Sequence, residues 1–292
     1  GNNKYFVNFE MPDALGEFEF NVTNGRIELQ GNMTSGADLL KTGSRELRIQ
    51  SSNGSTFTGD ITIREGPIRT GKQSGLGNHA SQTMTIEDGG LYLWGHAGGT
   101  VNFGLIDVQA GGRLDVRGGN VASTVTGPGR VSSSAGGGVS LTGDLSGFSG
   151  DLRFTGGNLS INTLLPVSDI EFSSDNKTFG GNGTVVFDLV NDTLDSIIAS
   201  DGAFDIANLN IDLSISGTQT LQEYVLANYD GADYDGSPFA SVTGLPAGWD
   251  IDYDGTAANP NSIVLFVPEP ATIVLGGIGA VGLLRRRTRS RG

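Results

Sequence analysis

The chain has no cysteine among its 292 residues, so disulfides, thiolate metal sites and cysteine catalysis are excluded for it. Its stability must therefore come from backbone pairing and side-chain packing. Histidine is almost absent as well, since His79 and His96 are the only two. No Gly-x-Ser-x-Gly elbow surrounds any serine, so the sequence does not favour a catalytic triad. We expect both histidines to be exposed polar residues at corners of the fold.

Positive charge is scarce, with 18 lysines and arginines against 32 aspartates and glutamates and a net charge of −14. Five of the arginines lie beyond residue 284, so the rest of the chain is more acidic still. An acidic surface of this kind repels phosphate backbones and anionic lipid. We therefore expect no nucleic-acid partner.

Glycine is abundant instead, with 47 residues, while charged residues make up 17% of the chain, a profile typical of repetitive β proteins. Short segments between glycines place apolar residues at every second position. That period is the period of a strand with one buried face. The segments are residues 25–31, 59–66, 90–95, 112–118 and 150–156.

Two internal repeats organise these segments. Residues 55–66 and 146–157 align as S-x-F-[ST]-G-D-[IL]-x-[IF]-x-x-G. Between them, residues 86–93 align with residues 108–116 after 22 to 23 positions, which places Leu91 opposite Leu114. A period of roughly 20 to 25 residues suits one coil of a β-solenoid, in which stacked coils bury a continuous apolar column.

The first repeat also resembles a known family. Residues 57–66 followed by Leu76 and Gly77, and the copy at residues 148–159, are similar to the autotransporter-associated β-strand repeat, T-Y-T-G-G-T-x-[IV]-x-x-G-x-L. Pro67 departs from that pattern, where the repeat has a small residue. The resemblance implies a right-handed parallel β-helix displayed on a cell surface. We predict an all-β fold, a right-handed parallel β-helix (solenoid) with a β-rich C-terminal cap and a short C-terminal hydrophobic helix.

Composition divides the chain into three predicted parts: solenoid repeats at residues 1–165, a β-rich capping region at residues 166–266, and a tail at residues 267–292. From about Pro166 the repeats fade and aspartate increases. We expect strands within residues 203–215 and 224–231, and a closing hairpin between residues 249–253 and 263–266. Such a cap would protect the open end of the solenoid from edge-to-edge pairing.

The tail has three sections in a fixed order. A proline-rich hinge precedes the uncharged residues 271–284, and arginines follow them. The hinge is Val267, Pro268, Glu269 and Pro270, and the first arginines are Arg285, Arg286 and Arg287. The 14 uncharged residues are fewer than the roughly 20 that span a bilayer comfortably. Arginines stay on the cytoplasmic side, which places the preceding chain outside. The alternative is a buried core helix with a basic end.

These residues resemble a PEP-CTERM sorting signal, with residues 267–270 as its motif. The resemblance implies export across the inner membrane of a Gram-negative-type bacterium and cleavage near Pro-Glu-Pro by an exosortase. It also implies release toward the outer surface or an exopolysaccharide matrix. An exported chain needs a secretion signal, and none follows Gly1. We therefore expect the sequence to be a processed chain or a C-terminal fragment.

Two acidic loops are candidates for weak calcium binding, and we expect no other cofactor. Their aspartates are Asp250, Asp252 and Asp254 in one loop and Asp230, Asp233 and Asp235 in the other. The first spells D-x-D-x-D-G, the opening of a calcium loop, but Asn261 stands where the bidentate glutamate is required. The alternative is a strand whose aspartates share the solvent face.

Two classes of function remain open. We expect a non-enzymatic surface or matrix protein for structure or adhesion, associated with exopolysaccharide. The alternative is a carbohydrate-active β-helix enzyme, which needs a basic residue to accept a proton or two facing carboxylates. The basic candidates are Arg64, Arg69, Arg113, Arg117 and Arg153. Sugar binding would also need exposed aromatic rings, for which Tyr92, Trp94 and Trp249 are the candidates.

Overall fold

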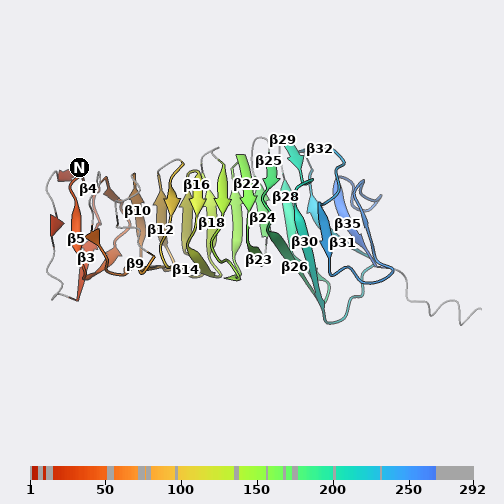
Figure 1. The fold of residues 1–292 in the computed structure, drawn as a ribbon, viewed down its shortest axis with the longest axis horizontal. Coiled ribbons are helices and arrows are strands. Elements are labelled where there is room, and N and C mark those ends of the chain that lie inside the picture. Colours follow the sequence, from red (N-terminus) through yellow and green to blue (C-terminus); the bar gives the residue numbers. More distant parts are fainter. Residues whose placement is uncertain are drawn as a thin grey trace, which may run out of the picture.

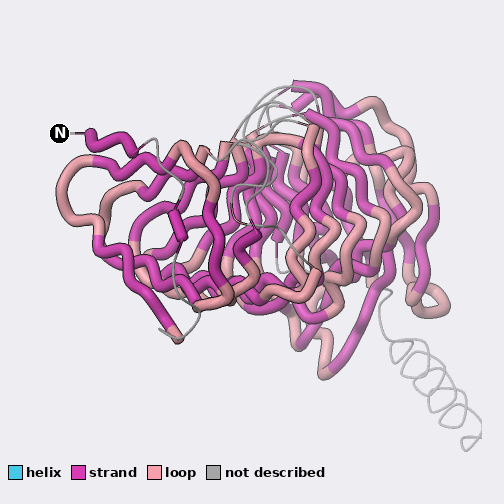
Figure 2. Tube along the Cα trace, turned by 60° about the vertical axis from the view of Figure 1, so that its left-hand side comes forward, coloured by secondary structure: helices cyan, strands magenta, loops and turns pink. Residues whose placement is uncertain are grey.

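A computed structural model describes residues 2–5, 9–10, 16–50, 56–71, 76, 80–95, 98–134, 138–155, 157–166, 169–172, 177–199, 202–230 and 232–267. These residues form strands, turns and loops and contain no helix (Figure 2). Figure 1 shows a long stack in which the strands lie across the long axis. The predicted all-β solenoid is therefore confirmed. The predicted C-terminal helix lies outside the described residues.

A sheet of 13 strands, called here the long sheet, extends from one end of the stack to the other. Its strands, in spatial order, are β1 (Asn2–Tyr5), β4 (Arg26–Leu29), β7 (Leu47–Ile49), β10 (Gly66–Thr70), β12 (Gly90–Trp94), β15 (Arg113–Val116), β18 (Arg130–Ser133), β21 (Asp151–Phe154), β24 (Asp169–Phe172), β28 (Ser196–Ala199), β31 (Glu223–Asn228), β35 (Ser262–Phe266) and β34 (Asp250–Asp252). Neighbours are parallel from β1 to β31.

Two further faces complete each turn of the coil, because the chain leaves the long sheet and crosses two other sheets before it returns. One face holds β2 (Phe9–Glu10), β5 (Met33–Ser35) and β8 (Thr56–Phe57), then β13 (Thr100–Val101), β16 (Gly119–Val121), β19 (Val139–Leu141), β22 (Gly157–Ile161), β25 (Lys177–Gly180), β29 (Gly202–Asp205) and β32 (Ala232–Tyr234). The other holds β3 (Glu17–Asn21), β6 (Asp38–Thr42), β9 (Ile61–Ile63), β11 (Thr83–Ile86), β14 (Leu105–Val108), β17 (Thr124–Gly127) and β20 (Gly147–Phe148), then β23 (Leu164–Pro166), β26 (Thr184–Val190), β30 (Asn210–Ser216) and β33 (Ser241–Thr243), with β27 (Thr193–Leu194) antiparallel to β26.

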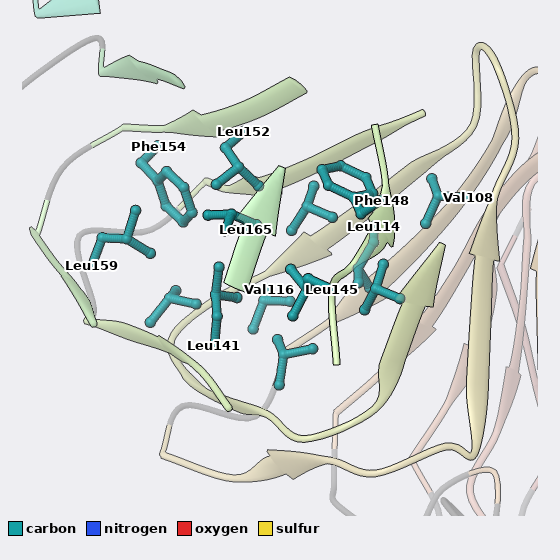
Figure 3. Packing of buried hydrophobic residues seen from close by; sticks show 14 of the residues in the cluster. Val108, Leu114, Val116, Leu141, Leu145, Phe148, Leu152, Phe154, Leu159 and Leu165 are labelled. Atoms are coloured by element: carbon teal, nitrogen blue, oxygen red, sulfur yellow. The ribbon is translucent and has the colours of Figure 1, made fainter. Parts of the chain in front are cut away.

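The core is a set of apolar columns that run along the axis, one residue from each turn. In the long sheet the register places Leu47, Ile68, Tyr92, Leu114, Val131, Leu152 and Ile170 in one such column. Each of these side chains is buried. Figure 3 shows the same packing in the middle of the stack, where side chains from all three faces fill the interior. Each fully buried side chain of this kind contributes about 1.5–3 kcal/mol, so no turn is stable without its neighbours.

Close contact between turns explains the glycine that precedes the aspartate in the repeated motif. A Cβ at Gly59 would lie 2.1 Å from the carbonyl oxygen of Ala37, and one at Gly150 would lie 1.7 Å from that of Gly129. In both copies the preceding turn approaches too closely for any side chain. The two copies nevertheless occupy different faces, because one extends over β8, β9 and β10 and the other over β20, β21 and β22. The sequence unit therefore encodes a strand and a corner, without a fixed position in the coil.

The register at Tyr92 corrects the alignment of residues 86–93 with residues 108–116. Tyr92 pairs with Leu114 and Trp94 with Val116, so Leu91 lies opposite Arg113 and points outward. Two matching turns set this register. The Gly90 N–H donates to the Glu87 carbonyl, and the Gly112 N–H donates to the Gln109 carbonyl. Tyr92 and Trp94 are 0% and 1% exposed. They fill the core and do not form a sugar platform, and Trp249 is half-buried against it.

Toward residue 267 the stack ends in an antiparallel arrangement. β35 pairs antiparallel with both β31 and β34, so the predicted closing hairpin is confirmed. Residues 203–215 contain parts of two strands, β29 and β30, as expected. Parallel stacking continues from β21 through β24 and β28 to β31, across the predicted boundary between residues 165 and 166. The division into a solenoid and a cap stays a prediction.

Candidate functional site

The outer face of the long sheet carries a row of arginines, in a protein that is acidic overall. These are Arg26, Arg48, Arg69, Arg113, Arg130 and Arg153 within strands, and Arg117 directly after β15. Each is adjacent in sequence to a residue that points inward, and strand side chains alternate between the two faces. We call this set the arginine row. Successive turns are about 4.8 Å apart, so the row extends along the axis.

Carboxylates accompany most of the row. Arg113 pairs with Asp115 at 3.6 Å and Arg130 with Asp151 at 3.7 Å. Arg153 pairs with Glu171 at 2.9 Å. The pairs of Arg130 and Arg153 are exposed and contribute about 0–1 kcal/mol each, so they shape the surface more than they stabilise the fold, whereas the Asp115 side chain is only 2% exposed.

Two shallow cavities lie on this face, with volumes of about 280 Å³ and 240 Å³. Arg113 and Arg130 line both of them. Ser132 and Ser134 line the second, where the Ser134 hydroxyl donates to Asp115 Oδ1 at 2.9 Å. The cavities therefore present guanidinium, carboxylate and hydroxyl groups together, which suits a polar ligand held by several hydrogen bonds.

The structure brings four of the five predicted arginines, Arg69, Arg113, Arg117 and Arg153, onto this one face. Arg64 does not join them, because it follows β9 on another face and its Nε donates to Glu87 Oε2 at 2.9 Å. Sequence reasoning missed Arg26, Arg48 and Arg130. The signal that identifies them is the stacking register, since Arg48 pairs with Arg69 and Arg130 with Arg113.

In the first acidic loop, local turns occupy the carboxylates of two aspartates. Asp252 Oδ1 accepts from the Asp254 N–H at 2.8 Å, and Asp250 Oδ1 accepts from the Ile251 N–H at 2.9 Å. These bonds are those of short polar turns. The flanking Tyr253 carbonyl accepts from the Tyr229 hydroxyl at 3.3 Å, which links the two acidic loops.

The second acidic loop is similar. Asp235 accepts from the Ser237 N–H at 2.9 Å and from its hydroxyl at 3.0 Å. The Asn261 amide donates to Asp230 Oδ1 at 3.3 Å, so the residue at the twelfth position contacts the other loop. Asp233 is exposed in β32. Within the described residues no three acidic or histidine side chains converge as a metal site. Calcium binding at either loop stays a prediction.

Asp195 is a titratable group that sequence reasoning missed. Burial raises the pKa of Asp195 to about 6, and the neighbouring carboxylates of Asp188 and Asp169 act in the same direction. The Asp188 N–H, which donates to Asp195 Oδ2 at 2.9 Å, opposes this shift. A raised carboxyl pKa is a property of general acids. The enzyme alternative would need a group of this kind together with a facing base.

The tail begins where the described structure ends. The Val267 N–H donates to the Gln222 carbonyl at 2.9 Å, just before β31, and this bond secures the end of β35. Pro268, Glu269, Pro270, the tail arginines and both histidines lie outside the described residues. The part of the chain that is described contains no helix able to cross a membrane.

Comparison with protein families matches residues 266–289 to the PEP-CTERM protein-sorting motif. Comparisons with curated proteins and with solved structures find no match. The resemblance to the autotransporter-associated repeat stays a prediction, with which the solenoid is consistent. The solenoid fits a surface protein, and the motif implies recognition by an exosortase and export through the membrane to the cell surface of a Gram-negative bacterium. The chain carries a PEP-CTERM sorting signal that begins at the end of β35, the last strand of the described residues.

Proposed function

We propose that this chain is a non-enzymatic structural or adhesion protein of the outer surface or extracellular matrix, associated with exopolysaccharide and released by an exosortase. The observation that carries the proposal is the position of the sorting motif. It begins at Phe266, the last residue of β35, so the signal is joined to the closing strand without a linker.

This junction allows removal of the tail without loss of the fold. Ile263, Val264 and Leu265 are each 0% exposed, and the Val267 N–H still reaches the Gln222 carbonyl. Cleavage near Pro270 would fall after all of these contacts. The solenoid would keep its closing strand and leave the membrane as a folded body.

The surface of the long sheet supports a structural role over catalysis. Its outward carboxylates Asp115, Asp151 and Glu171 each lie beside an arginine. This is the arrangement of cross-strand ion pairs, whereas a glycosidase places two carboxyl groups facing one another across the scissile bond. Rigid stacking and an acidic surface also suit an exported protein that must stay soluble.

The test is the intact mass of the protein recovered from the inner-membrane, outer-surface and medium fractions of the native host. We expect the surface and medium forms to lack everything after about Pro270. In a Pro268→Ala, Pro270→Ala variant the full chain should stay in the inner membrane, whereas Ala257→Ser, in an exposed loop before β35, should be processed normally.

Two results would overturn the proposal. A full-length wild-type chain retained in the inner membrane would show that the tail is a plain anchor. New reducing ends or unsaturated products formed from polysaccharide by the purified protein would establish the enzyme alternative.

A further inference from the structure

Three arginines of the arginine row form a strip in which only one, Arg48, has an ion-pair partner, Glu28 at 3.9 Å. Arg48 and Arg69 lie directly opposite one another on β7 and β10. Arg117 lies further along the axis, after β15, and its positive charge is close enough to lower the pKa of Arg69. We call Arg48, Arg69 and Arg117 the arginine strip. All three side chains are half-buried, so their guanidinium groups are held against the sheet.

Two glycines make room for this strip. Gly71 directly follows β10, and Gly95 directly follows β12. At the corresponding positions, neighbouring turns carry side chains. A Cβ at Gly71 would lie 2.7 Å from the side-chain amide group of Gln50. A Cβ at Gly95 would lie 3.5 Å from Arg69 Nε and 3.9 Å from Nη2. The Arg69 side chain therefore lies over Gly95, on the turn between its own strand and Arg117.

Charge is unbalanced at the strip. Burial lowers the pKa of Arg69, and repulsion from Arg117, Arg48 and Arg26 lowers it further, while Glu46 alone acts in the opposite direction. The nearby carboxylates are shared with Arg26, which lies 3.1 Å from Glu28 and 3.7 Å from Glu46. Like charges held this closely favour an anion from outside the chain.

Two of the arginines in the strip also have hydrogen-bond donors without partners. The Nε atoms of Arg69 and Arg117 are shielded from solvent and have no hydrogen-bond partner. Neither side chain forms an ion pair with any residue that the structure describes. A guanidinium group also carries donors on its two Nη atoms, and a carboxylate or sulfate that pairs with them would supply the charge partner that both side chains lack.

We propose that the arginine strip binds a linear acidic polysaccharide through its carboxylate or sulfate groups. The row continues along the axis through Arg113 and Arg130 and the two cavities that they line. An extended polymer could therefore contact several turns at once. Guanidinium groups suit this ligand because their fork of donors matches both oxygens of a carboxylate or sulfate.

The spacing of charges favours a polysaccharide over a nucleic acid. Double-stranded DNA carries one negative charge per about 1.7 Å of its axis and is repelled by an acidic protein. Along this face some of the arginines have carboxylates beside them, as at Asp115 and Asp151. A polymer with sparse charges and many hydroxyl groups can accept hydrogen bonds from the arginines and donate them to the carboxylates.

This inference rests on the proposed association with exopolysaccharide and names the class of polymer, but its test is independent of sorting. The full chain, purified in a non-ionic detergent, would be titrated with alginate, a linear polyuronate, and with neutral dextran and double-stranded DNA. Single variants Arg69→Gln, Arg117→Gln and Arg64→Gln each remove one positive charge, and Arg64 serves as the control because it lies on another face and is paired with Glu87. Arg117→Lys keeps the positive charge but lacks the paired N–H donors of the guanidinium group.

We expect alginate to bind with an affinity that falls as salt rises, and dextran to bind far more weakly. Arg69→Gln and Arg117→Gln should each weaken binding about tenfold or more, and Arg64→Gln should leave it unchanged. Arg117→Lys should fall between wild type and Arg117→Gln. Circular dichroism would check that each variant is folded.

Equal binding by wild type and Arg117→Gln would overturn the proposal, as would equal losses in Arg64→Gln and the strip variants. Tighter binding of DNA than of alginate would identify a nucleic-acid site instead. If alginate binds as expected while the tail stays uncleaved in the host, the sorting proposal fails and this one stands.

Discussion

The phenol oxygen of Tyr92 lies 3.0 Å from Oγ1 of Thr70, and both residues are 0% exposed. They come from neighbouring turns, β12 and β10, and lie in adjacent inward columns, because Tyr92 pairs with Ile68 and Thr70 with Trp94. Burial raises the pKa of Tyr92, and the Thr70 hydrogen bond opposes that shift, so the phenol stays neutral. Each hydroxyl satisfies the other where water cannot reach.

This pair predicts non-additive mutant stabilities. Thr70→Val and Tyr92→Phe should each lower the free energy of unfolding by about 1–3 kcal/mol, because the remaining hydroxyl loses its partner. The double variant should lose less than the sum of the two, since it leaves neither hydroxyl unsatisfied. Urea denaturation of the four proteins measures the coupling. If the single effects simply add, the two hydroxyls are independent.

A second prediction concerns the motif glycine. Gly150→Ala should destabilise the protein by about 3 kcal/mol, because its Cβ would lie 1.7 Å from the Gly129 carbonyl oxygen. Gly180→Ala is the matched control, since the nearest atom to its Cβ is Ser160 Oγ at 4.0 Å. That change should be neutral or stabilise by a few tenths of a kcal/mol. Thermal midpoints would compare the two, and equal shifts would contradict the steric explanation.

A third prediction concerns Lys41, a lysine that occupies a core position. It is 0% exposed, and the register places it between Phe20 and Ile63. Its Nζ donates to the carbonyl oxygens of Thr42 at 2.8 Å, Gly43 at 2.6 Å and Glu65 at 3.0 Å. Burial lowers the pKa of Lys41 to about 8, and attraction to the Glu65 carboxylate opposes the shift.

The lowered pKa of Lys41 predicts how stability depends on pH. Between pH of about 8 and the ordinary value of 10.5, the unfolded chain binds more protons than the folded one. The contribution of Lys41 to the free energy of unfolding should therefore rise with pH across this window. Lys41→Met should remove that rise. Denaturation at several pH values tests the slope, and an unchanged slope in the variant would show that Lys41 is not its source.

The period of the apolar residues was sufficient to predict the strands and their stacking. Alternation at residues 59–66 or 112–118 requires one buried face, and a short strand buries too little surface to be stable alone. The tail could be predicted for a similar reason, because its hinge, apolar run and arginines are contiguous in sequence. A contiguous signal does not depend on the fold.

The candidate site could not be predicted in the same way. Apart from Arg113 and Arg117, which belong to one turn, the arginines of the row come from different turns and are far apart in the sequence. Whether Arg64 or Arg48 joins Arg69 depends on which face each strand occupies, and the repeated motif itself appears on different faces at Phe57 and Phe148.

The sequence alone therefore determined that this protein is a cysteine-free, stacked β structure with a sorting signal in its tail, because strand period and tail order are local properties. The tertiary structure decided which residues meet. A shift of one position moves a side chain from the core to the surface, so only the register could place Tyr92 inside and Leu91 outside. The same register brings Arg48 and Arg69 together on the outer face.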